Sequence, residues 1–291
     1  MRSILSFILL LLAFSGIMAQ KTAFQLFDAK GKKISYSKWL KKTAEADVIC
    51  FGELHNNPIG HWLQYEFLLD LIEKRGSEKV VVGAEMFESD QQVALSQYIK
   101  GEIDAKTLKE TIKLWPNYDT DYKPVVDLCK ENSIEVIATN VPRKYARMVA
   151  REGGLKALDS LPKEETQFIA PLPFEIDYEL PSYAAMIEMM AGHGGDSKAN
   201  DFVAAQAVKD ATMAYFLLEN LGEDQVFYHL NGSYHSQHKE GILWYVAQKR
   251  PDLTLFNITL VEQSQVKELE KDYLGEADII IVVPETMTKT Y

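Results

Sequence analysis

A strand, a turn and the start of a helix can be identified in the stretch Val48-Ile49-Cys50-Phe51-Gly52-Glu53-Leu54-His55-Asn56-Asn57-Pro58. Its first four residues form an unbroken apolar run, which favours a strand with helices packed on both of its faces. Asn57 offers an N-cap, and Pro58 suits the first turn of a helix. The stretch therefore predicts a buried strand that leads through a polar turn into a helix.

Short apolar runs of this kind alternate with longer helical patterns along the rest of the chain. We expect strands at about residues 47–51, 79–83, 134–139, 225–230, 253–259 and 278–283. Helical patterns fill the intervals at about residues 61–74, 91–99, 125–130, 143–151, 199–219 and 242–248. The alternation predicts the α/β class, with a mainly parallel sheet flanked by helices.

Residues 160–200 interrupt this alternation, because four of the ten prolines and three glycines fall there. We interpret them as a helical insertion that lies over the carboxyl ends of the strands. Two more helix starts are expected outside it. Ser89-Asp90 would cap one helix, and Val141-Pro142 would place Pro142 just inside another.

The composition excludes several classes of protein. Of the 291 residues, 47% are hydrophobic and 25% are charged, as in ordinary soluble globular proteins. Forty-two acidic residues against 31 basic ones give a net charge of −11. This charge repels phosphate backbones, so nucleic acid is not expected as a partner. An anionic ligand would need a local basic pocket.

The N-terminus resembles a secretory signal peptide. Arg2 precedes an apolar run at residues 4–14, and small residues lead to Ala19, where we expect cleavage. The alternative is a retained anchor. We expect an exported, periplasmic or extracellular protein, with residues 20–291 forming a single domain. Cys50 and Cys129 are expected to be buried thiols.

Ionisable side chains follow several of the predicted strands. Glu53 and His55 come after the first strand, Glu85 after the second, Arg143 after the third and His235 after the fourth. Because ligands of open α/β sheets bind outside the carboxyl ends of the strands, these residues form the candidate site.

Two chemistries suit Glu53, His55, Glu85 and His235. They could ligate a divalent metal and lower the pKa of a bound water. Alternatively, one histidine or glutamate could act as a general base on water without a metal. Simpler roles remain open: the histidines could cap helices, Glu85 could favour a helix N-terminus, and Arg143 could pair with a surface acid.

The predicted insertion contains a methionine-rich segment, residues 181–193, with Tyr183, Met190 and His193. Thioethers around a planar ligand, with a tyrosine or histidine as axial ligand, would suit haem. The methionines also follow helical spacing, so an ordinary packed core is the alternative.

Six stretches in order resemble the ChaN-like haem-binding lipoproteins of the Tiki superfamily, which is related in fold to erythromycin esterases. They are Gly52–Asn57, Glu85–Gln92, Asn140–Arg143, Gly192-His193, Gln206–Ala214 and Gly232–His235. The resemblance implies the α/β fold of that superfamily with helical additions. It also implies that His55 and His235 match paired histidines that serve metal-dependent peptidases in the Tiki branch.

The ChaN branch is associated instead with haem uptake, with haem bound through a tyrosine and with assembly as a dimer. By this resemblance, Tyr145 and Tyr183 are candidates for the ligand, with His193 nearby. Arg143 would pair with a haem propionate, and the insertion with Met190 would wall the ring.

We therefore expect an exported haem-binding protein for iron uptake, acting as a homodimer with an outer-membrane haem transport system. The alternative is a metal-dependent hydrolase that uses Glu53, His55, Glu85 and His235. The chain departs from the family in two ways. No cysteine lies near the expected cleavage point, so a lipid anchor is not expected, and Ser233-Tyr234 stands where a shorter Gly-x-Gly-His pattern would be.

Overall fold

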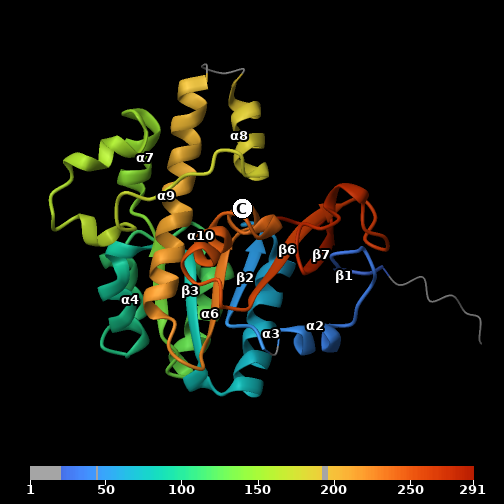
Figure 1. Ribbon diagram of the computed structural model, residues 1–291. Coiled ribbons are helices and arrows are strands. Elements are labelled where there is room, and N and C mark those ends of the chain that lie inside the picture. The colour runs from blue at the N-terminus through green and yellow to red at the C-terminus, as the bar shows by residue number, and fades with distance from the viewer. Residues whose placement is uncertain (1–20, 44, 192–195) are drawn as a thin grey trace, which may run out of the picture.

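The computed structural model describes residues 21–43, 45–191 and 196–291, which fold around a seven-stranded sheet with helices on both faces (Figure 1). The expected signal peptide and His193 lie outside these residues. The strands are β1 (Gln25–Asp28), β2 (Val48–Glu53), β3 (Val80–Glu88), β4 (Val136–Asn140), β5 (Val226–Gly232), β6 (Leu255–Gln263) and β7 (Ile279–Pro284). Their order in the sheet is β1-β7-β6-β2-β5-β3-β4. All pairs are parallel except β1 with β7, which confirms the mainly parallel sheet.

The α-helices confirm the six predicted helical segments and add others. They are α2 (Tyr36–Lys42), α3 (Pro58–Arg75), α4 (Gln92–Ile99), α5 (Ala105–Thr111), α6 (Lys123–Glu131), α7 (Arg143–Arg151), α8 (Pro181–Ala191), α9 (Asp196–Asn220) and α10 (Ile242–Lys249). Among the described residues, no helix is long and apolar enough to cross a bilayer.

Alternate residues of each central strand pack into two different cores, which explains the unbroken apolar runs. Ile49 and Phe51 of β2 face a core formed with α2, α3, α4 and α6. Val48 and Cys50 face a second core formed with α9 and α10. Because both faces are covered, neither could be polar without burying unpaired groups.

Two of the expected helix starts need correction. Glu88, and not Ser89-Asp90, caps the turn that precedes α4: its side chain accepts from the backbone of Gln91, whose own side chain accepts from the Glu88 N–H at 3.0 Å. Pro142 lies immediately before α7 and not inside it. Asn57 caps α3 as expected, accepting from the N–H groups of Ile59 and Gly60.

The long helix α9 connects the sheet to the candidate site. Its C-terminal half packs on the sheet, and its N-terminal half projects past the carboxyl ends of the strands between α7 and α8 (Figure 1). Helix α8 therefore stands over the end of β2, and the C-terminus of the chain lies between them (Figure 1). This arrangement confirms a helical insertion over the carboxyl ends of the strands.

Candidate functional site

The ionisable residues predicted from the strand exits do meet at one edge of the sheet. Strands β2, β5 and β3 are neighbours, and Glu53 at the end of β2 lies in register with Gly232 at the end of β5. The strands extend further than expected: parallel pairing of β2 with β5 continues to Glu53, and β3 continues to Glu88 past a register shift between Ala84 and Glu88. Glu53 and Glu85 are therefore held inside strands rather than on the loops that follow them.

Glu53 is a buried carboxylate with a complete set of partners. It accepts hydrogen bonds from the Tyr122 hydroxyl at 2.7 Å and from the Gln64 amide at 2.5 Å. His55 Nδ1 lies 2.9 Å from Glu53 Oε1, which the Tyr122 hydroxyl also contacts. The side chain of Glu53 is fully buried, whereas that of His55 is 35% exposed. Glu53 thus anchors one ring nitrogen of His55 and leaves the other nitrogen toward the cavity.

The position of the His55 ring depends on a glycine. A Cβ atom at residue 232 would lie 2.8 Å from both Cε1 and Nε2 of His55, and 3.5 Å from Oε2 of Glu85. Only glycine lets the ring lie against the end of β5 in this way. Burial lowers the pKa of His55, but its hydrogen bond to Glu53 and the charge of Glu85 raise it more, so the net pKa lies above its usual value.

A second chain of polar groups runs from Glu85 away from the cavity. His235 lies on the short 3-10 turn after β5, with Nε2 3.2 Å from Glu85 Oε1 and Nδ1 hydrogen-bonded to Asp210. The other oxygen of Asp210 accepts from the Tyr183 hydroxyl at 2.6 Å, and Glu85 also accepts from the Gly232 N–H at 2.7 Å. Each buried carboxylate is therefore satisfied.

His235 is a buried imidazolium. Burial lowers its pKa, but the charges of Glu85 and Asp210 outweigh this effect and raise the pKa to about 10. Burial likewise raises the pKa of Glu85, but the charge of His235 opposes it and holds the net pKa well below the usual range. The two groups therefore form an ion pair at neutral pH.

The predicted metal site does not form from Glu53, His55, Glu85 and His235. Both ring nitrogens of His235 face carboxylates: Nε2 lies 3.2 Å from Glu85 Oε1, and Nδ1 is hydrogen-bonded to Asp210. Within the described part of the chain, no group of three or more histidine, cysteine, aspartate or glutamate side chains could hold a metal ion. This donor set does not fit a divalent metal.

A cavity of about 710 Å³ opens above these residues, between the sheet edge and α8. Glu53, His55, Glu85 and His235 line its floor. Its walls carry apolar and aromatic side chains from α8, α9, the turn after β5 and the C-terminal segment, namely Ala185, Met186, Met189, Phe202, Tyr234 and Tyr291.

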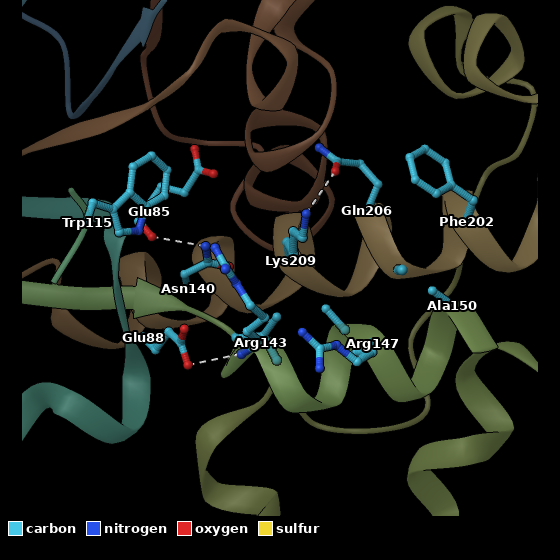
Figure 2. A pocket seen from close by; sticks show the side chains of 13 residues that line it. Glu85, Glu88, Trp115, Asn140, Arg143, Arg147, Ala150, Phe202, Gln206 and Lys209 are labelled. Atoms are coloured by element: carbon cyan, nitrogen blue, oxygen red, sulfur yellow. Dashed lines mark hydrogen bonds between the residues drawn. The ribbon is translucent and has the colours of Figure 1, made fainter. Parts of the chain in front are cut away.

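A second cavity of about 390 Å³ adjoins the first and shares Glu85, Phe202, Gln206 and Lys209 with it. Figure 2 shows α7 and α9 facing each other across it, with Arg143 and Arg147 on α7 and Lys209 on α9. None of these three cations forms an ion pair with a carboxylate among the described residues. This cavity is the local basic pocket that an anionic ligand would need in a protein of charge −11.

The residues predicted to bind a cofactor are placed differently from one another. Arg143 lines the basic cavity. Tyr145 and Tyr183 are buried, and their hydroxyls donate to Glu165 and Asp210 rather than pointing into either cavity. Met190 is half-buried on α8, whereas its neighbours Met186 and Met189 line the larger cavity.

The sequence argument missed Asp210, Lys209 and Gln206 as members of the site. Their spacing on α9 was the available signal, because residues three and four positions apart share one face of a helix. Tyr234 and Tyr291 were also missed, although they are tyrosines that line the larger cavity. His229 has a structural role, since it forms hydrogen bonds with Thr139 and Asn231 inside the sheet.

Comparison with solved structures shows which known proteins share this fold. A structure described as cofacial haem binding to ChaN of Campylobacter jejuni is 19% identical, with a TM-score of 0.67 over 89% of this chain and 96% of that one. A mutant erythromycin esterase is 11% identical, with a TM-score of 0.52 over 93% of this chain and 99% of that one. At these identities the likeness concerns the fold.

Comparisons of sequence show the family as well as the fold. A curated relative, the chloroplastic protein RETICULATA-RELATED 5 of Arabidopsis thaliana, is 27% identical over 118 residues, which cover 39% of this chain and 16% of the plant protein. The family described as haem-binding uptake, Tiki superfamily, ChaN matches residues 39–246, which is more than half of the chain. The chain therefore belongs to the ChaN family of haem-binding uptake proteins in the Tiki superfamily.

Proposed function

We propose that this protein binds haem in the joined cavities at the carboxyl edge of the sheet and serves haem uptake. The observation that carries the proposal is that a cavity with methionine and aromatic walls adjoins a basic one and shares lining residues with it. Haem has the same two parts, a large apolar ring and two propionates at one edge. The donor set therefore fits this cofactor.

The two cavities assign separate tasks to their lining residues. Met186, Met189 and Phe202 would contact the ring, and Arg143 with Lys209 would pair with the propionates. Bound haem supplies a ferric ion that takes an axial ligand. For this ligand we propose Tyr234 or Tyr291, because their side chains are exposed at the cavity, whereas the hydroxyls of Tyr145 and Tyr183 already donate to carboxylates.

A titration of the purified protein with ferric haemin tests this proposal. We expect saturable, stoichiometric binding with the charge-transfer bands of tyrosinate ligation. One of the two variants Tyr234→Phe and Tyr291→Phe should abolish these bands, because only one tyrosine is the ligand. Tyr145→Phe should keep them. Binding that never saturates would refute the haem site, and bands that survive in both cavity variants would refute the ligand assignment.

The propionate contacts have a matched control on the same helix. Arg143→Gln should weaken haemin binding by roughly tenfold, as expected for the loss of one charge-assisted hydrogen bond at an exposed site. Arg151 is also exposed on α7 but lies outside both cavities, so Arg151→Gln should bind haemin like the wild type. Equal losses in both variants would mean that only net charge matters.

We further propose that the protein is exported and dimerises over its bound haem. Export is supported by the N-terminal sequence, and dimerisation by the exposed side chains of Met189, Phe202, Tyr234 and Tyr291 around the cavity. An outer-membrane haem transport system would be its partner. Cell fractionation with N-terminal sequencing tests export. Sedimentation with and without haemin tests the dimer, which should form only with haemin.

A further inference from the structure

We propose that the basic cavity between α7 and α9 also binds a phosphoryl dianion that carries a hydroxyl donor, namely monohydrogen phosphate or a phosphate ester of a small polyol. This binding needs neither haem nor the walls of the larger cavity, so it goes beyond the proposed function. Two features of the cavity carry it. Three cations line it with no ion-pair partner among the described residues, and one half-buried carboxylate, Glu88, lines it as well.

Helix α7 has a charge pattern that opposes its own stability. Its nine residues include no acidic one and four basic ones, which are Arg143, Lys144, Arg147 and Arg151. Arg143 stands at the first helical position, where the helix dipole favours negative charge. Arg147 lies one turn later on the same face, so the two guanidinium groups repel each other. An anion bound between these groups would remove both penalties, which a purely structural helix has no reason to carry.

Lys209 brings a third positive charge to the opposite wall of the cavity. It lies on α9, which faces α7 across the cavity (Figure 2). Its Nζ atom is 3.5 Å from the amide oxygen of Gln206, which is a neutral partner. Cations from two facing helices can contact one dianion from both sides, and the planar fork of arginine matches the oxygens of a phosphoryl group. The cavity is therefore suited to a multiply charged oxyanion.

Glu88 gives the same cavity a hydrogen-bond acceptor. Its carboxylate accepts from the backbone N–H groups of Gln91 and Arg143, the latter at 3.0 Å. A carboxylate has about four lone-pair positions, so Glu88 can accept a further hydrogen bond from a ligand. Monohydrogen phosphate has one O–H group to donate there, whereas sulfate has none and would be repelled by the carboxylate. The cavity should therefore distinguish two anions of similar shape and equal charge by one proton.

The size of the cavity determines which sources of the phosphoryl group fit. Its volume of about 390 Å³ exceeds that of a single phosphate ion. Trp115 and Phe202 line it together with the small side chains of Ala146, Ala150 and Ala205. The remaining space would hold waters around free phosphate, or a polyol of a few carbon atoms esterified to it. Both sources present the same charged group to the three cations.

Isothermal titration calorimetry of the haem-free protein at about pH 7.5, where phosphate is mainly the dianion, tests the proposal. We expect saturable one-to-one binding of phosphate that is at least tenfold tighter than binding of sulfate at equal ionic strength, because sulfate lacks one hydrogen bond and leaves the Glu88 acceptor unpaired. Glycerol 2-phosphate identifies the source: tighter binding than phosphate supports the ester, and weaker binding supports the free ion. Equal affinity for phosphate and sulfate, or phosphate binding that never saturates, would overturn the proposal.

Matched variants separate this site from an effect of net charge. Arg147→Gln should weaken phosphate binding about tenfold, as expected for the loss of one charge-assisted hydrogen bond. Arg151→Gln removes the same charge from an exposed position of α7 outside both cavities and should bind phosphate like the wild type. Equal losses in the two variants would overturn the assignment to the basic cavity.

The role of Glu88 has its own test. Glu88→Gln replaces the carboxylate by an amide that can also donate, so sulfate should bind about as tightly as phosphate in this variant. Urea unfolding shows whether the variant remains folded, and a gain in sulfate affinity cannot come from unfolding. A preference for phosphate that survives in Glu88→Gln would overturn the selection by a donated proton.

Competition with haemin separates this proposal from the haem site. Both ligands would use Arg143 and Lys209, so saturating phosphate should raise the apparent Kd for haemin, and sulfate at the same concentration should raise it less. Haemin binding is read from its spectrum and phosphate binding from its heat. Haemin binding without phosphate binding would refute the phosphate site alone, and phosphate binding without haemin binding would refute the haem site alone. Binding of both without competition would refute the shared use of these two cations.

Discussion

The ion pair of Glu85 with His235 provides a stability test whose sign can be worked out from the structure. The pKa of His235 is about 10 in the folded protein against 6.5 in the unfolded chain. A histidine of raised pKa stabilises the fold fully below pH 6.5 and loses that contribution as the pH rises toward 10. The loss over the whole window is on the order of a few kcal/mol.

The substitution Glu85→Gln removes one charge and keeps the shape of the side chain. Breaking a buried ion pair costs roughly 3–5 kcal/mol, and we expect about 3 because Asp210 still faces His235. The pKa of His235 then falls, so the variant has less stabilisation to lose. The difference in unfolding free energy between wild type and variant should therefore shrink as the pH rises from 6 toward 10.

Urea unfolding of both proteins at several pH values between 6 and 10 measures this difference. Titrating groups common to both proteins cancel in the comparison. Glu110→Gln serves as the control, because Glu110 pairs with Lys106 at the exposed surface and its removal should have a small, pH-independent effect. The reasoning would be refuted by a difference that stays constant across this range, or by one below about 1 kcal/mol at pH 6.

Three further substitutions test individual contacts near the carboxyl edge of the sheet. Gly232→Ala should push the His55 ring away and lower the free energy of unfolding in urea by about 1–3 kcal/mol; an unchanged free energy would show that the ring has room. Asn57→Ala removes the cap of α3, and urea unfolding should reveal a loss of about 1 kcal/mol. Thr290 donates to Asp121 at 2.7 Å, so Thr290→Ala should cost about 1 kcal/mol, whereas loss of only a few tenths would show that this contact is unimportant.

The sequence by itself determined the layers of this protein. The strands β2 and β3 could be predicted from their apolar runs. Both faces of a central strand are buried, so consecutive residues must all be apolar. The start of α3 could be predicted from Asn57 and Pro58, since a helix cap depends only on residues that are neighbours in the sequence. Strand β1 was missed, because four residues at the sheet edge carry too short a pattern.

The candidate site was only half determined in this way. Glu53, His55, Glu85 and His235 could be grouped, because the carboxyl ends of parallel strands meet at one edge of a sheet. Their chemistry could not be chosen, because a metal ligand and a protonated ion-pair partner can be the same residue type. The choice depends on the groups that face each ring.

Only the tertiary structure supplied those facing groups. Asp210 comes from α9 and lies 25 positions before His235 in the chain, yet it is hydrogen-bonded to the Nδ1 atom of that histidine. Tyr145 and Tyr183 were candidates by composition, and their burial against carboxylates depends on how α7 and α8 pack on α9. Such contacts depend on how helices that are distant in the sequence pack together, and a local sequence pattern does not predict them.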